Sequence, residues 1–313
     1  VLLVFRSESV GTDIIRYKYH FYNYSVLSLK QIAEGILSGE FETGYVVLCR
    51  FIGIFTDNFR YVLIVCALIS LIPIWYFYRQ EEKYGYFLTI MFANVAPFAM
   101  FFSGLRQALS LAMAIPAYYF CRNRNFSKFL VCVFAAFLFH RSALILLLMY
   151  PAFHVRIKKP SQFLLLIPPI ALISTFKTRI FSFLLIFSGD VYYSRYASDV
   201  HETGAGSVLL LLMALTMISF LLPSVELLND DDIGLRNILL LASVLQIFAS
   251  IHSLAMRLNY YFLLFVPVAV ARCLRKCDKN KKIANYLLIS LMCFMTVFFF
   301  YHAYTDKDIL QIF

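Results

Sequence analysis

The sequence predicts an all-α, polytopic bundle of transmembrane helices, and three observations support this fold class. Hydrophobic residues make up 61% of the 313 residues and charged residues only 15%, and the mean hydropathy is +0.76, too apolar for an ordinary soluble domain. Runs of roughly 15 to 20 apolar residues recur along the chain, enough for a helix to cross a hydrocarbon core of about 30 Å. Barrel strands would instead alternate apolar and polar residues.

Basic loops predict which side of the membrane each segment faces. The stretch RCLRKCDKNKK, residues 272–282, carries six basic residues against one acid and is expected to be cytoplasmic. Counting back from it, the apolar segments alternate in direction: 258–271, 237–256, 207–222, 161–176, 126–153, 105–119, 86–103 and 60–78. We expect a single integral membrane domain over residues 1–313 with about 9 to 11 spans and short or broken helices at the outer face.

The same count places residues 6–59 in an external or interfacial segment and residues 189–206 in an external loop. The opening VLLVF is interpreted as the end of a first span, and residues 44–55 are too short to cross, so we expect them to lie in the interface. The run 126–153 is interrupted by His140, Arg141 and Ser142. A hairpin folded at His140 keeps the basic segments on both sides of the run inside, whereas one long span would separate them.

Cations gather at the predicted outer ends, against the positive-inside bias. They are Arg6, Arg16, Arg106, His140, Arg141, His252 and Arg257. A guanidinium at the edge of a bilayer is costly and persists where it binds something, so this group predicts an anion site. The net charge of +10 is attributed to cytoplasmic loops, and no nucleic-acid partner is implied.

Other patterns are interpreted as structural. The seven cysteines show no spacing that predicts a disulfide framework or zinc. Asp230, Asp231 and Asp232 follow a span on the predicted inner side, and we expect a solvated loop there. No metal and no cofactor is expected, and the phosphate-binding and hydrolase motifs of soluble enzymes do not occur.

An ordered series of motifs resembles the EpsG family of Wzy-like bacterial polysaccharide polymerases. The series is FRSESVGTD followed by Tyr17, FETGY at residues 41–45, GLRQALSLAMAI at 104–115, FHRSALILL at 139–147 and RLNYYF at 257–262. Arg141 within the FH-x-SA element departs from the family's pattern.

The resemblance implies a multi-pass enzyme of the bacterial inner membrane with its active site facing the periplasm or exterior. Such an enzyme joins oligosaccharide repeat units carried on undecaprenyl pyrophosphate into an O-antigen, capsule or exopolysaccharide. Its expected partners are this lipid-linked oligosaccharide and membrane lipids, with a chain-length regulator and a flippase beside it.

In this reaction a sugar hydroxyl attacks an anomeric carbon, and a lipid pyrophosphate leaves already ionised. No acid has to protonate it, so the site needs cations for the diphosphate and one base for the hydroxyl. We assign Arg106 and Arg257 to the diphosphate, and His140 or its rival Asp13 as the base. Further candidate substrate contacts are Arg6, Arg16, Tyr17, Gln107, Arg141, Ser142, His252, Tyr260 and Tyr261.

Two other classes of function remain open. A flippase for lipid-linked sugars would also hold arginines in a cavity, but transporters are often built from repeated halves, and no internal repeat is found. Another membrane transferase, either an O-antigen ligase or an acyltransferase that uses histidine, would rely on similar residues.

Overall fold

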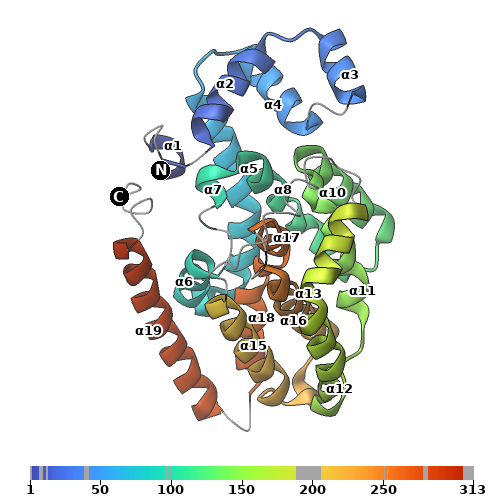
Figure 1. Cartoon of the computed structure of the whole chain (residues 1–313). Helices are drawn as coiled ribbons and strands as arrows, with labels where there is room; N and C mark the ends of the chain where they lie inside the picture. The colour runs from blue at the N-terminus through green and yellow to red at the C-terminus, as the bar shows by residue number, and fades with distance from the viewer. Residues whose placement is uncertain are drawn as a thin grey trace. The chain divides into compact units, whose positions relative to one another are not determined.

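The computed structural model describes the chain apart from residues 1, 7–9, 12, 39–41, 96, 97, 99, 188–205, 250, 252, 278–280 and 306–313. Every regular element in this described part is a helix, so the all-α prediction is confirmed (Figure 1). The helices form two compact units, each described by itself: Val1–Leu147 with Met292–Phe313, and Leu148–Leu291. The single domain stays a prediction, and the predicted external loop falls outside the described residues except for Gly206.

The first unit contains most of the short helices. They are α1 (Leu2–Phe5), α2 (Ile14–Ser25), α3 (Leu29–Leu37), α4 (Thr43–Gly53), α5 (Arg60–Tyr78), η1 (Arg79–Tyr84), α6 (Gly85–Asn94), α7 (Met100–Ser103), α8 (Leu105–Ala112), α9 (Ala114–Arg122), α10 (Phe126–Phe139) and η2 (Arg141–Leu148), with the later part of α19 (Lys281–Thr305).

The second unit contains longer helices around a buried centre. They are α11 (Met149–His154), α12 (Pro160–Leu164), α13 (Ile167–Phe187), α15 (Gly206–Leu221), η4 (Val225–Leu227), α16 (Asp230–Ala249), α17 (Ser253–Leu263) and α18 (Val266–Arg275).

Several helices have the length and composition to cross a membrane. Among the described residues these are Arg60–Glu81, Pro160–Phe183, Asp230–Ala249 and Lys281–Tyr301. The pair Ala255–Leu263 and Val266–Arg275 passes the same test together and bends by 42° at its break. The chain is therefore a polytopic membrane protein, and the number of 9 to 11 spans stays a prediction.

Two of the predicted spans are divided into shorter helices. Segment 86–103 is divided between α6 and α7, and segment 105–119 is divided between α8 and α9. In the second case Pro116 supplies the reason, because its missing N–H removes the bond to the carbonyl of Ala112, where α8 ends. Pro267 acts in the same way on Leu263 at the end of α17.

The helices α2 and α4 pack together against one end of α5 (Figure 1). Tyr17 and Phe21 on α2 meet Tyr45 and Cys49 on α4, and the core extends to Leu109 on α8. The segment 44–55, expected in the interface, thus buries one face in protein as α4. Its 11 residues agree with the prediction that it is too short to cross.

A ladder of polar side chains runs along α16, a long and largely buried helix of the second unit. Thr216 and Ser243 hydroxyls lie 2.7 Å apart, and the Asn259 amide donates to Gln246 at 2.8 Å. At the N-terminal half the Asn237 amide donates to the carbonyl of Val155 at 2.7 Å. Because the hydroxyls and the amide donors have partners, the helix can bury these residues at a reduced penalty, although the amide oxygens of Asn237 and Asn259 have no hydrogen-bond partner among the described residues.

The prediction of a solvated loop at residues 230–232 is wrong. These three aspartates form the first turn of α16, and Asp231 and Asp232 are buried. Asp231 forms an ion pair with Arg272. The Oδ2 atom of Asp232 lies 3.7 Å from Nζ of Lys276. The physical reason is that carboxylates stabilise a helix N-terminus and that cations of α18 neutralise them.

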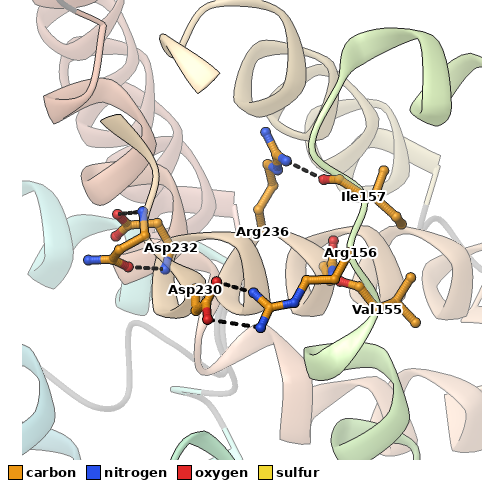
Figure 2. A network of polar contacts seen from close by, with 8 residues as sticks. Val155, Arg156, Ile157, Asp230, Asp232 and Arg236 are labelled. Carbon is orange, nitrogen blue, oxygen red and sulfur yellow. Dashed lines mark hydrogen bonds and ion pairs between the residues drawn. The ribbon is translucent and has the colours of Figure 1, made fainter. Parts of the chain in front are cut away.

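Figure 2 shows the exposed side of this turn. The two terminal guanidinium nitrogens of Arg156 both donate to the carboxylate of Asp230. The contact from Nη2 to Oδ2 measures 2.8 Å. Asp232 exchanges hydrogen bonds with the backbone and side chain of Asn229. The fully buried Arg236 donates to the carbonyl of Ile157, so the segment after α11 is fixed to α16.

Candidate functional site

Glu42 joins two of the sequence-predicted site residues in the first unit. It is the N-cap residue of α4. Its Oε1 lies 2.8 Å from His140 Nδ1 and its Oε2 lies 2.9 Å from Arg106 Nη1. Since Oε2 has no aligned hydrogen-bond donor in the described part of the chain, the Arg106 contact is an ion pair without hydrogen-bond geometry.

Local structure brings these three side chains from three helices to one place. Arg106 is the second residue of α8, and His140 ends α10 in an extended conformation. A Cβ atom on Gly44 would lie 2.9 Å from the ring of Phe139, so only glycine lets the first turn of α4 approach α10 so closely. The FETGY motif thus supplies both the carboxylate and the approach that places it.

Helix α2 adds an aromatic side to the site. The Arg106 Nε donates to the Tyr17 hydroxyl at 3.5 Å, and its guanidinium lies 5.6 Å from the centre of that ring. Tyr17 in turn packs edge-on against Tyr45 at 5.4 Å. Burial raises the pKa of Tyr17 although Arg106 opposes this, so the hydroxyl stays neutral.

The charges of the site keep Glu42 ionised. Burial alone would raise its pKa, but the hydrogen bond from His140 and the charges of His140 and Arg106 together lower it, helped by the backbone N–H of Arg141. A carboxylate only accepts hydrogen bonds, so His140 Nδ1 carries the hydrogen and its Nε2 is the basic atom of the neutral ring. The exposed fractions of the Arg106, His140 and Glu42 side chains are 32%, 22% and 13%, so a ligand can reach the group.

Sequence reasoning missed two members of this site. Glu42 was quoted only within a motif, because an acid in a polar segment has no periodic signal. His20 lies one turn after Arg16 on α2, and the Arg16 Nε approaches its Nε2 at 3.3 Å. Burial first, then the charges of Arg106 and Arg16, lower the pKa of His20. The acid in FETGY, placed among clustered cations, was the signal that could have found Glu42.

The remaining predicted residues of this unit lie around the site or apart from it. Asp13 is the N-cap residue of α2 and makes no capping bond with its side chain. Gln107 is buried on α8, with 3% of its surface exposed. Arg6 is buried against α7, where Nη1 donates to the Phe101 carbonyl at 3.4 Å. Arg141 and Ser142 begin η2 beside His140.

The other candidates belong to the second unit or lie outside the described residues. Arg257 is exposed on α17, Tyr260 is half-buried, and Tyr261 is fully buried in the core. Helix α17 begins at Ser253, so Arg257 lies within α17 and not between spans as expected. His252 is not among the described residues. A meeting of Arg257 with Arg106 stays a prediction.

Comparison with known proteins gives one result. No curated protein and no solved structure matches the chain. All 313 positions, residues 1–313, match the EpsG family, and the motif residues Glu42, Arg106 and His140 are those that the structure brings together. The chain therefore belongs to the EpsG family, a family of membrane proteins related to the Wzy-like polysaccharide polymerases.

Proposed function

We propose that this protein polymerises oligosaccharide repeat units carried on undecaprenyl pyrophosphate, by metal-independent glycosyl transfer at the outer face of the bacterial inner membrane. Membership of the EpsG family supports the polymerase class. The observation that carries the proposal furthest is the contact of Glu42 with both Arg106 and His140. Through this contact one carboxylate holds both the proposed base, His140, and a permanent cation, Arg106.

His140 is the proposed general base. Its Nε2 takes the proton of the acceptor hydroxyl while the hydroxyl oxygen forms a bond to the anomeric carbon of the donor. Glu42 holds the ring through Nδ1 and stabilises the imidazolium that results, as a carboxylate does for a catalytic histidine in hydrolases. Asp13 is the weaker candidate, because its side chain makes no capping hydrogen bond that would position it.

Arg106 is the proposed stabiliser of the leaving group. The bond from the anomeric carbon to the diphosphate oxygen breaks, and its electron pair leaves on the diphosphate. The guanidinium has five donors, of which Nε faces Tyr17 while Nη1 lies 2.9 Å from Glu42 Oε2, and the remaining donors are proposed to bind phosphate oxygens. Arg257 is proposed to bind the same diphosphate.

Deletion of the gene tests the function. Without a polymerase, lipopolysaccharide should carry single repeat units on its core, visible on a gel as one step in place of a ladder. Loss of a ligase would leave no units attached, and loss of a flippase would leave them on the cytoplasmic side. Normal long chains in the deletion strain would reject the proposal.

Arginine variants test the assignment to the diphosphate. Arg106→Ala and Arg257→Ala, expressed in the deletion strain, should each reduce polymer by about 100-fold or more, since a lost charged donor to a transition state costs about 2.7–4 kcal/mol. Immunoblots of membranes should show normal protein levels. Arg79→Ala, which removes a cation stacked on Trp75, is the matched control and should keep the ladder. Near-normal polymer in either test variant would reject that residue's role.

A further inference from the structure

A cavity in the first unit holds cations that the proposed chemistry does not use. Its volume is about 100 Å³, and Arg6, Lys18 and Arg60 line it together with the polar residues Tyr22 and Asn58. No carboxylate is found among the described residues that line it. Three cations around a polar cavity create a strongly positive potential, which attracts an anion.

Arg6 is the central group of this cavity. Only 7% of its surface is exposed, and both Nε and Nη2 are buried without a hydrogen-bond partner among the described residues. In the described part of the chain it contacts the Phe101 carbonyl at 3.4 Å and the ring of Phe102 at 5.5 Å, neither of which neutralises a charge. An uncompensated buried guanidinium is costly, and planar paired donors suit phosphate oxygens.

The surroundings hold Arg6 in place for such a ligand. Arg60 Nη1 donates to the carbonyl of Val4 at 3.1 Å, which fixes the end of α1 to the start of α5. On the other side, Gly11 has a φ of +97°, and a Cβ atom there would lie 2.2 Å from the carbonyl oxygen of Phe102. The hydrogen bond at Val4 thus holds the chain before Arg6 against α5, and Gly11 packs directly against the backbone of Phe102.

The volume of the cavity indicates whether it is suited to a water molecule or to a larger anion. A second void next to Arg6, shared with Ser70, measures about 10 Å³, which is room for about one water. The main cavity, at about 100 Å³, is about ten times as large as this void, so it has room for a phosphoryl group.

The proposed polymerisation needs two phosphate sites, because the donor and the acceptor each carry a lipid diphosphate. The diphosphate that leaves must lie beside the reacting carbon, near His140 and Arg106. The Arg6 cavity has no histidine or carboxylate among its described lining residues, and its guanidinium groups suit the binding of phosphate oxygens. Resting on the proposed function, we propose that the Arg6 cavity binds the diphosphate that is not consumed, that of the acceptor.

The binding step is tested apart from activity. Full-length Arg106→Ala protein in neutral detergent is titrated with inorganic pyrophosphate by calorimetry, so that the Arg106 site does not contribute. Adding Arg6→Gln should weaken binding about 10- to 100-fold, the effect of losing a charge-assisted pair of hydrogen bonds. Adding Arg79→Gln, an equal loss of charge at the other end of α5, should leave affinity within about twofold. Equal affinities in all three proteins would overturn the site.

If the Arg6→Gln protein does not fold, Lys18→Gln replaces it, because Lys18 is only half-buried on the cavity wall. The source of the anion is tested in nanodiscs of phosphatidylcholine with and without phosphatidylglycerol. Pyrophosphate affinity that is unchanged by phosphatidylglycerol supports a substrate site. Competition by phosphatidylglycerol assigns the cavity to a lipid headgroup and rejects the acceptor's diphosphate.

The role in transfer is tested with two acceptors, one lipid-linked and one a free oligosaccharide without diphosphate. Arg6→Gln should raise KM about 10- to 100-fold for the lipid-linked acceptor alone. An equal loss with both acceptors would overturn the proposal while leaving the polymerase intact. If the wild type forms no polymer although pyrophosphate binding depends on Arg6, the proposed function fails and the anion site remains.

Discussion

Replacing Glu42 with glutamine is expected to lower the rate of polymer formation by the full-length protein about 10²- to 10⁴-fold, the range that a general base contributes. Glutamine keeps the shape but removes the charge between His140 Nδ1 and Arg106. The imidazolium formed in the reaction then has no anion to stabilise it. Rates with lipid-linked repeat units, measured from gel ladders over time, give the size of the effect.

A positioning role is separated from a structural one by a conservative variant. Glu42→Asp keeps a negative charge beside His140 and Arg106 and should recover part of the rate that Glu42→Gln loses, whereas a purely structural role would lower the amount of protein that membrane immunoblots detect. Glu34→Gln is the matched control, an acid-to-amide change on α3 at an exposed side chain 3.8 Å from Lys30. A Glu42→Gln rate within twofold of the wild type would rule out the base assembly.

Asp231→Asn is expected to destabilise the second unit by about 3–5 kcal/mol, the usual cost of breaking a buried ion pair. Asp231 and Arg272 side chains are each only 9% exposed, so the change leaves a buried guanidinium without its anion. Thermal unfolding of the purified protein in detergent should show a clear fall in Tm. Replacing both residues, with Asp231→Leu and Arg272→Met, should recover most of the loss.

The neighbouring residue provides the control. Asp230 belongs to the same first turn of α16 and pairs with Arg156, but both side chains are exposed to solvent. Asp230→Asn removes the same charge from the same helix end, so the interaction with the helix dipole changes equally. It should change Tm little, because water screens the exposed pair. Equal losses in Asp230→Asn and Asp231→Asn would contradict the role of burial.

Helix content could be predicted from the sequence because hydropathy is a local property, but the breaks could not. The helix ends at Ala112 and Leu263 follow from prolines four residues later, yet α5 continues through Pro73. Whether a proline ends a helix depends on packing that satisfies the freed carbonyl. Asp231 and Asp232 were misread for a similar reason, since their cations come from α18.

The site was predicted in part. Arg106 and His140 were found because they interrupt apolar segments, where a charge needs a purpose. The end of α10 at His140, where the hairpin was expected to fold, is confirmed. Glu42 was not found, because its significance comes only from its partners on α8 and α10. Arg6 was predicted as a cation at the outer end, but its two unpartnered donors are visible only in three dimensions.

The close approach of Gly44 to α10 means that the proposed transfer reaction depends on the position of α4. Glu42 belongs to the segment before α4, whereas His140 and Arg106 belong to α10 and α8, so the carboxylate is delivered from outside the helices that carry its partners. A displacement of α4 by the width of one methyl group would move the Glu42 carboxylate away from the His140 ring. The proposed activity is therefore tied to the correct position of this short helix, and a bulky side chain at position 44 should abolish that activity although Glu42, Arg106 and His140 all remain present.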